Sequence, residues 1–290
     1  MSAVNKTLRI GAGKSNTEIN SAKKMSEELS LQGIISTIRY YETGDLFVSA
    51  NTILYNALLN NEIDTTPVEL STVALWTDRE DILPTAISVR NYPAFILLIS
   101  EKCFDPSGDL KIKKDSLVGV TSLLQGEQLI HLNPYIRLHY TDENTDAQIN
   151  QLKNGVYNAL VVCSEIIEKY QNEVTGYHSV KIHPTEMIHT PGYGVTAYLS
   201  HKDDLVTRKM LKTIHHSDTA KCTNIERKVL QLAGPDYADK IGVYCYTDQR
   251  NFFHAVAVRC DEFKKVNFSQ SIATGMSEKI YDSLFNQIQH

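Results

Sequence analysis

The sequence lacks several features that define large classes of proteins. Its longest apolar run, residues 94–99, is far shorter than the roughly 20 residues of a transmembrane helix, so we expect no membrane insertion. The net charge is −5 and no basic stripe is present, which argues against nucleic-acid binding. The first residues contain no apolar signal segment, and we therefore expect a soluble, cytoplasmic protein.

Paired cysteines are also lacking. The five cysteines are odd in number and have no CxxC spacing, which argues against a disulfide framework and against a thiolate metal site. Cys163 and Cys245 lie in apolar segments and are expected to be small core residues. His215 and His216 are neighbours in sequence and point to different sides of a helix, so we expect structural or solvated roles for them and no bound metal.

A nucleotide-binding P-loop is absent, although residues 11–15 read Gly-Ala-Gly-Lys-Ser between an expected strand and an expected helix. The P-loop motif requires a glycine at position 8, where this chain has Leu8. What remains is a helix N-terminus, whose free N–H groups favour anions, next to Lys14 and Ser15. These two residues are candidate anion ligands.

Thr121 and Ser122 have the equivalent place in a second strand–helix pair, again at the start of an expected helix. Two such helix N-termini facing each other across a cleft would suit an anionic small molecule. The simpler alternative is that these Ser and Thr residues only cap their helices. Ligand contact and capping both remain open at this point.

The present features indicate an α/β protein. The helix expected after residue 15 has apolar residues on one face and ends at Gly33. Strands are expected at 8–10, 34–40, 117–120, 135–140 and 157–163, with helices at 122–132 and 145–153. Two strand–helix–strand stretches about 100 residues apart predict two α/β domains.

The last 90 or so residues predict a small α+β domain. Helices are expected from about 203, at 219–232 and at 270–288, and antiparallel strands at 241–247 and 252–259.

Five segments in order resemble the porphobilinogen deaminase (hydroxymethylbilane synthase) family of tetrapyrrole biosynthesis. They are RIGAGKS at 9–15, VGVTSLLQGEQL at 118–129, QLKNGVYNALVV at 151–162, PGYGVTAYLSHKDD at 191–204 and HHSDTAKCTNIERKVLQLAG at 215–234. They are similar to the family's R-I-G-T-R-K-S, V-G-T-S-S-L-R-R-x-x-Q-L, K-L-D-x-G-x-Y-D-A-I-I-L, V-G-Q-G-A-L-G-I-E-x-R and H-x-x-T-x-x-x-x-x-A-E-R-x-x-L-x-x-L-E-G-G-C. The resemblance covers nearly the whole chain.

This resemblance implies two α/β domains like those of type II periplasmic binding proteins, around a cleft, with a small C-terminal α+β domain. The expected division is 1–88 plus about 189–203 for domain 1, 89–188 for domain 2, and 204–290 for the C-terminal domain. In the family, a cysteine of the C-terminal domain carries a dipyrromethane cofactor through a thioether.

The chain departs from the family at the cofactor and catalytic positions. The cofactor cysteine position is Asp236, which cannot form a thioether. Cys245 lies in an expected apolar strand and is a poor substitute. The catalytic-acid position is Thr72, downstream of the matching Asp64, and Glu69 would lie on a different face if this segment were a strand. No catalytic or cofactor-binding residue is therefore assigned.

The substrate-binding positions differ as well. The family's arginine positions correspond here to Gly13, Leu124, Gln125, Asp142 and Gln148. Where an arginine attracts a carboxylate, Asp142 would repel it. The family's lysine-bearing, glycine-rich active-site segment is missing, since Gly44 and Asp45 run directly into Leu46 and Phe47.

The leading hypothesis is a catalytically degenerate family member, a pseudoenzyme with no cofactor, that acts as a structural, binding or interaction protein for an unknown protein partner or a small anion. The alternatives are a divergent active hydroxymethylbilane synthase, which would carry dipyrromethane, and a cytosolic small-anion-binding protein.

Overall fold

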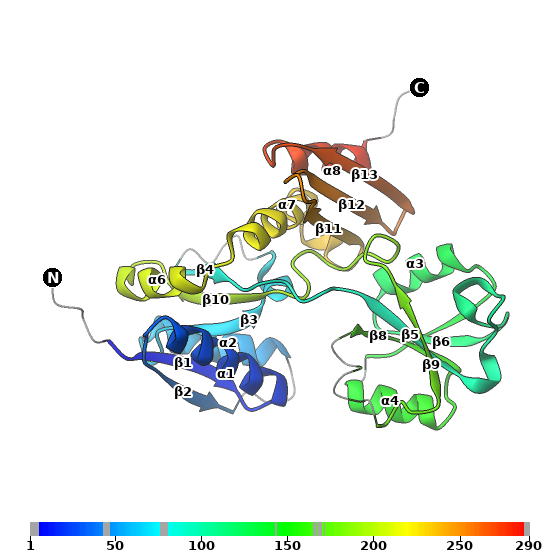
Figure 1. Ribbon diagram of the computed structural model, residues 1–290, viewed down its shortest axis with the longest axis horizontal. Helices are drawn as coiled ribbons and strands as arrows, with labels where there is room; N and C mark the ends of the chain where they lie inside the picture. The colour runs from blue at the N-terminus through cyan, green and yellow to red at the C-terminus, as the bar shows by residue number, and fades with distance from the viewer. Residues whose placement is uncertain are drawn as a thin grey trace. The chain divides into compact units, whose positions relative to one another are not determined.

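The computed structural model describes residues 6–42, 47–75, 81–142, 144–164, 167, 170 and 172–286. Contacts divide the chain into two compact units, each built from two separate stretches (Figure 1). Unit 1 comprises Met1–Asn91 and Gly192–Asn224, and unit 2 comprises Tyr92–Pro191 and Ile225–His290. The three-domain division expected from the family remains a prediction.

Unit 1 is built on a mixed sheet. Its strands are β1 (Leu8–Gly13), β2 (Ser36–Tyr41), β3 (Thr66–Glu69), β4 (Ile82–Ile87) and β10 (Thr196–His201). β1 pairs with β2 in parallel, and β10 lies antiparallel between β3 and β4. A parallel bridge between Ile10 and Thr65 joins the two parts, giving the lateral order β2-β1-β3-β10-β4.

Helix α1 (Asn16–Leu31) shows why the sequence folds this way in unit 1. Its buried residues Ala22, Met25 and Leu29 recur at helical spacing and pack with the apolar side chains of β1. The helix stops before Gly33, whose φ of 73° favours glycine. Further helical elements described in the unit are α2 (Phe47–Leu59), α6 (Leu205–Leu211), and the 3-10 helices η1 (Leu70–Val73) and η4 (Lys212–Ile214).

Unit 2 contains a five-stranded sheet with the same plan. Its strands are β5 (Phe95–Ser100), β6 (Leu117–Val120), β7 (Arg137–Tyr140), β8 (Ala159–Cys163) and β9 (Tyr177–Ile182), in the order β7-β6-β8-β5-β9. Here β6 is parallel to β7 and β8, whereas β5 is antiparallel to β8 and β9. Helices α3 (Leu123–Leu132) and α4 (Thr145–Lys153) and the 3-10 helices η2 (Glu101–Cys103) and η3 (Asp109–Lys111) complete this part.

The C-terminal part of the chain is α+β, as predicted. Its sheet has the antiparallel order β11-β12-β13, with β11 (Ile241–Thr247), β12 (Phe253–Arg259) and β13 (Lys264–Gln270). Helices α7 (Ser217–Ala233) and α8 (Met276–Phe285) and the 3-10 helix η5 (Pro235–Tyr237) accompany it (Figure 1). α7 belongs to unit 1 up to Asn224 and to unit 2 thereafter.

The fold class is thus confirmed: each α/β part has the strand order of a type II periplasmic-binding-protein domain, and a small α+β part follows. Two expectations about elements were wrong. The closing helix does not begin at 270, because residues 264–270 form β13, and α8 starts at Met276. Residues 70–73 form a 3-10 helix, so the argument about strand faces does not apply to Thr72.

No helix among the residues that the structure describes is long and apolar enough to cross a membrane.

Candidate functional site

The N-terminus of α1 is closed by the chain's own side chains. Ser15 is the N-cap: its Oγ accepts a hydrogen bond from the Glu18 N–H at 3.2 Å and donates to Glu18 Oε2 at 2.6 Å. The Glu18 carboxylate also accepts from the Ser15 N–H, which completes a capping box. Lys14 forms an ion pair with Glu42. A carboxylate therefore already occupies the place that an external anion would take.

Gly13 is tied to this arrangement. A Cβ atom built on Gly13 would overlap the Glu18 carboxylate. Gly13 holds a position where the family has an arginine, so an arginine side chain at this backbone position requires Glu18 to move.

The N-terminus of α3 is closed in a similar way by a neutral group. Ser122 is the N-cap and accepts from the Gln125 N–H at 3.2 Å. The buried Gln125 side chain turns back, and its Oε1 accepts from both the N–H and the Oγ1 of Thr121, each at 2.9 Å. Both predicted capping roles are therefore observed. The hydroxyl of Thr121 is engaged within the chain.

Asp64 is a buried ion-pair partner in unit 1. Its Oδ2 accepts from Arg9 Nε at 3.0 Å and from the Arg9 N–H at 2.8 Å, and its Oδ1 accepts from Arg9 Nη2 at 2.9 Å. Lys6 Nζ lies 3.0 Å from Oδ1 and 2.8 Å from Asp204 Oδ2. Burial alone would raise the pKa of Asp64, but the hydrogen bonds from Arg9 and Lys6 lower it to about 2. Asp64 thus anchors the start of β1.

Thr72, at the family's catalytic-acid position, has a local structural role. It is half-buried in η1, and its Oγ1 donates to the Glu69 carbonyl oxygen at 2.7 Å. Ser71 precedes it in the same 3-10 turn. Glu69 ends β3 and is exposed. Neither Ser71 nor Thr72 can supply a carboxylate.

Asp236 lies in an exposed turn that begins at Gly234, whose φ is 91°. The turn is held by Lys240, whose Nζ donates to the Asp236 carbonyl oxygen at 2.9 Å. The alternative thiol, Cys245, is 1% exposed within β11, and its N–H donates to Glu226 Oε1 at 2.8 Å. An exposed carboxylate and a buried thiol do not fit a group attached by a thioether.

The remaining family positions lie on different parts of unit 2. Leu124 and Gln148 are buried, and Asp142 is exposed in the loop after β7. Gly44, Asp45 and Leu46, where the active-site segment is missing, lie outside the described residues.

The paired histidines have structural partners, as predicted. His215 Nδ1 accepts from the Ile87 N–H at 3.2 Å, and the His216 N–H donates to the Ile87 carbonyl oxygen at 2.8 Å. Burial lowers the pKa of His215, which suits its role as a neutral acceptor. All five cysteines are free thiols. No group of His, Cys, Asp or Glu in the described part of the chain has the geometry of a metal site.

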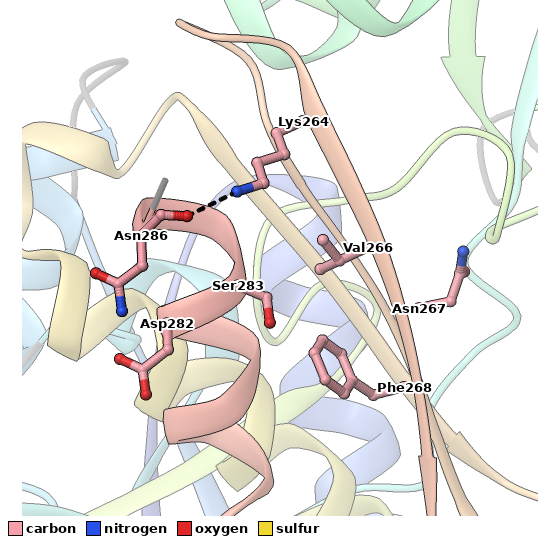
Figure 2. Close-up of a pocket in the computed structure, with 7 residues that line it drawn as sticks. All are labelled: Lys264, Val266, Asn267, Phe268, Asp282, Ser283 and Asn286. Atoms are coloured by element: carbon pink, nitrogen blue, oxygen red, sulfur yellow. Dashed lines mark hydrogen bonds between the residues drawn. The ribbon is translucent and has the colours of Figure 1, made fainter. Parts of the chain in front are cut away.

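A shallow pocket lies between β13 and α8 (Figure 2). It is lined by Lys264, Val266, Asn267, Phe268, Asp282, Ser283 and Asn286. Lys264 Nζ donates to the Asn286 carbonyl oxygen at 3.0 Å across one end (Figure 2). None of the positions predicted from the sequence belongs to this lining.

Two features were not predicted from the sequence. One is the role of Glu18, although the S-x-x-E spacing of residues 15–18 is a capping-box signal. The other is the hydrogen-bonded group of Asp248, His254 and Ser269, which forms only because β12 pairs with β13.

Comparison with known proteins gives consistent results. No model of a known protein family matches the chain. A "Probable porphobilinogen deaminase" of Methanocaldococcus jannaschii is 25% identical over 275 residues, covering 90% of this chain and 91% of that protein. A "Porphobilinogen deaminase" of Orientia tsutsugamushi is 26% identical over 265 residues, covering 86% of each. A third, from Picrophilus torridus, is 20% identical, covering 89% and 92%.

Solved structures show a distant similarity. One is a putative periplasmic sulfonate-binding protein of Methylobacillus flagellatus, with a TM-score of 0.46, 12% identity, and coverage of 80% of this chain and 70% of that chain. Another is a probable extracellular amino-acid-binding protein of Bacillus subtilis, with a TM-score of 0.46, 14% identity, and coverage of 76% and 96%.

The strand orders of the two α/β parts and the α+β part define a protein of the type II periplasmic-binding-protein fold class with an added C-terminal domain. Within that class, the ordered motifs and the relatives that align over nearly the whole chain point to one family. The chain is similar to porphobilinogen deaminases over nearly its whole length and differs from them at three quarters or more of the aligned positions.

Proposed function

We propose that this family member has lost dipyrromethane attachment and deaminase catalysis, and acts as a binding or interaction protein. The observation that carries the proposal is Asp236. A thioether requires a thiolate sulfur as the nucleophile, and a carboxylate at the same place cannot form that bond. No step of the proposed function uses the cofactor.

The catalytic-acid position supports the same proposal. Loss of ammonia from a pyrrole-methylamine builds positive charge, which a nearby carboxylate stabilises. Thr72 offers a hydroxyl that is already hydrogen-bonded to the backbone of Glu69. Restoring a carboxylate at this place would therefore require a change of residue.

The substrate-binding positions support it as well. The acidic side chains of porphobilinogen need cationic partners, and the family positions hold Gly13, Gln125, Asp142 and Gln148. Gln125 is turned back onto Thr121. An acidic linear tetrapyrrole would meet neutral and negative groups at these positions.

A protein partner is favoured over a small anion, because the side chains at the two helix N-termini are already bound within the chain. Ser15 and Lys14 face the carboxylates of Glu18 and Glu42, and an anion would have to displace them. Thr121 and Ser122 are engaged with Gln125. Anion binding at Lys14 and Ser15 in unit 1, or at Thr121 and Ser122 in unit 2, remains the second candidate, because helix N-termini attract anions.

The competing proposal, a divergent active hydroxymethylbilane synthase, needs a different cofactor anchor. Cys245 is the nearest thiol in sequence to Asp236, but it is buried in β11. A bulky adduct there would have to separate the sheet from α7, which holds the Cys245 N–H through Glu226. Because this disruption would destabilise the fold, an active hydroxymethylbilane synthase is the weaker of the two proposals.

The test is the mass of the intact purified protein, followed by incubation with porphobilinogen. We expect the bare polypeptide mass and no bilane product, with an active family deaminase as the positive control. A covalent dipyrromethane adduct would overturn the proposal. Turnover of porphobilinogen by the unmodified chain would overturn it equally.

A further inference from the structure

A row of polar side chains crosses the C-terminal sheet of unit 2 at one end. Tyr246 on β11 is the partner of His254 on β12, and His254 is the partner of Ser269 on β13. Directly paired residues of adjacent antiparallel strands project to the same face of a sheet. Asp248, in the turn between β11 and β12, lies at the end of this row.

The row contains a linked chain of hydrogen bonds. His254 Nδ1 lies 2.7 Å from Ser269 Oγ, and His254 Nε2 lies 3.1 Å from Asp248 Oδ2. The other carboxylate oxygen of Asp248 accepts from the N–H groups of Arg250 at 2.8 Å and Phe252 at 2.9 Å. The imidazole also stacks on the ring of Tyr246, with 5.1 Å between centroids. All its parts come from one small sheet.

The partners determine which nitrogen carries the proton. The Phe252 N–H and then the His254 imidazole lower the pKa of Asp248, so the carboxylate is ionised and only accepts. Nε2 of the neutral imidazole must therefore carry the hydrogen, which leaves the lone pair on Nδ1. The Ser269 hydroxyl is then the donor to Nδ1. This is the orientation in which an imidazole removes a proton from a hydroxyl nucleophile.

We propose that Asp248, His254 and Ser269 form a nucleophilic site, at which Ser269 accepts an acyl group from small activated esters. Ser269 Oγ attacks the ester carbonyl carbon while His254 Nδ1 takes the hydroxyl proton. The carbon–oxygen bond of the ester then breaks, and the leaving alcohol takes that proton from Nδ1. Water hydrolyses the acyl-serine by the reverse proton path, so atoms and protons balance.

Exposure determines the substrate class. Ser269 is exposed, and the His254 side chain is 27% exposed, so small esters have direct access to both. An open site offers little binding energy for a large acyl chain, because little apolar surface is removed from water. Esters with a good leaving group are therefore the expected substrates. The inference does not depend on the function proposed above, because none of its residues corresponds to a deaminase position.

The test uses the full-length protein with p-nitrophenyl acetate and with a fluorophosphonate probe, read by intact mass and peptide mapping. We expect a single adduct on Ser269 and its loss in Ser269→Ala. A general base contributes at least roughly a hundredfold, so His254→Gln should slow labelling of Ser269 by a factor of that order. Unchanged thermal unfolding of His254→Gln would show that the sheet is intact.

Ser107 is the matched control. It is also exposed, and its Oγ donates directly to Asp105 Oδ1 at 2.7 Å, with no imidazole between them. We expect no labelling of Ser107, and unchanged labelling of Ser269 in Ser107→Ala. Equal labelling of the two serines, no labelling of Ser269, or labelling that persists in His254→Gln would each overturn the proposal.

Discussion

Asp64 illustrates how a single buried charge can be kept in a folded protein. Its side chain is 3% exposed, yet every lone-pair direction faces a cation or an N–H group, from Arg9 and Lys6. Removing one partner of such a buried ion pair leaves the other charge uncompensated, which destabilises the folded state. The aspartate was matched to the family from the sequence, but its ion-pair role depends on the close approach of β1 and the residues before β3.

This site predicts acid sensitivity. The pKa of Asp64 is about 2 in the folded chain, below its ordinary value of 3.8, so its contribution to stability is complete above about pH 4 and is lost as the pH falls toward 2. The difference corresponds to about 2 kcal/mol of unfolding free energy. Urea unfolding at pH 7 and pH 3 should show about half of this loss, roughly 1 kcal/mol, because the folded carboxyl group is still largely ionised at pH 3.

Asp64→Asn should lower the unfolding free energy at pH 7 by several kcal/mol, because Arg9 loses its carboxylate partner and Lys6 keeps only Asp204. Asp218→Asn is the matched control, since Asp218 pairs with Lys221 on the surface, where water screens the charges, and its replacement should change stability far less. Equal effects of the two substitutions would contradict the structural role of Asp64.

Glu18 yields a second prediction at this scale. Glu18→Ala should lower stability by about 1 kcal/mol through loss of the capping box, and should expose the N–H groups of α1 to anions. Sulfate should then raise the melting temperature of the variant more than that of the parent chain. Glu27→Ala, an exposed change on the same helix, should leave the sulfate response unaltered. An equal response in the parent and Glu18→Ala would show that the carboxylate does not block the site.

The sequence predicted part of the site because capping is a local property. Ser15 and Ser122 cap their helices as expected, and the substitutions at Asp236 and Thr72 were visible without a structure. The side-chain directions of Glu18 and Gln125 were not predicted: the capping-box spacing at Glu18 was overlooked, and Gln125 could equally have pointed to solvent. Their positions follow from nearby donors at Ser15 and Thr121.

At the scale of elements, long periodic segments were predicted well and short ones were not. The limits of α4 and β11 agree with the sequence, since both have clear patterns and breakers. β13 alternates Val266 and Phe268 with polar residues, a strand signal for which no strand was predicted, and its last residue, Gln270, was placed in the closing helix. β10 was missed because its partners, β3 and β4, come from far earlier in the chain.

Gln128 joins elements within unit 2. Its Nε2 donates to the carbonyl oxygens of Leu124 and Ile188, both at 2.9 Å, and its Oε1 accepts from the Ile188 N–H at 2.7 Å. The side chain is buried and replaces a strand partner for Ile188. Beside it, Leu124 and Ile188 pack with Val256, Val258 and Cys260 of the C-terminal sheet.

Gln128→Ala should therefore lower the unfolding free energy by about 2–4 kcal/mol, since it leaves both polar groups of Ile188 buried and unpaired and creates a cavity. Chemical denaturation measures the change. Gln249→Ala, at an exposed position, should stay within about 0.5 kcal/mol of the parent chain. A neutral effect of Gln128→Ala would mean that water or another group can replace the amide.

At the scale of the whole molecule, each unit is assembled from two stretches of chain, so no single stretch holds a complete core. The α/β class was predictable because strand–helix–strand patterns are local. The interleaving was available only through the family resemblance, because it depends on pairings such as β10 with β4.

The thiols give a prediction for the whole chain. Cys222, Cys245 and Cys260 are buried, and burial raises the pKa of Cys260 to about 12, whereas Cys103 and Cys163 are half-buried. A thiol-reactive chromogenic disulfide should modify at most Cys103 and Cys163 in the native protein at pH 8. All five should react in denaturant without reductant. Fewer than five in denaturant would reveal a disulfide.

The overlap between Gly13 and Glu18 has a consequence for the history of the chain. Replacing Gly13 by arginine while Glu18 remains would force the new side chain against the capping carboxylate. Replacing Glu18 first would remove a cap before any gain in binding. Because the Glu18 carboxylate is the end of a flexible side chain, it can turn away from an arginine at position 13, and the change then costs the Glu18 half of the capping box.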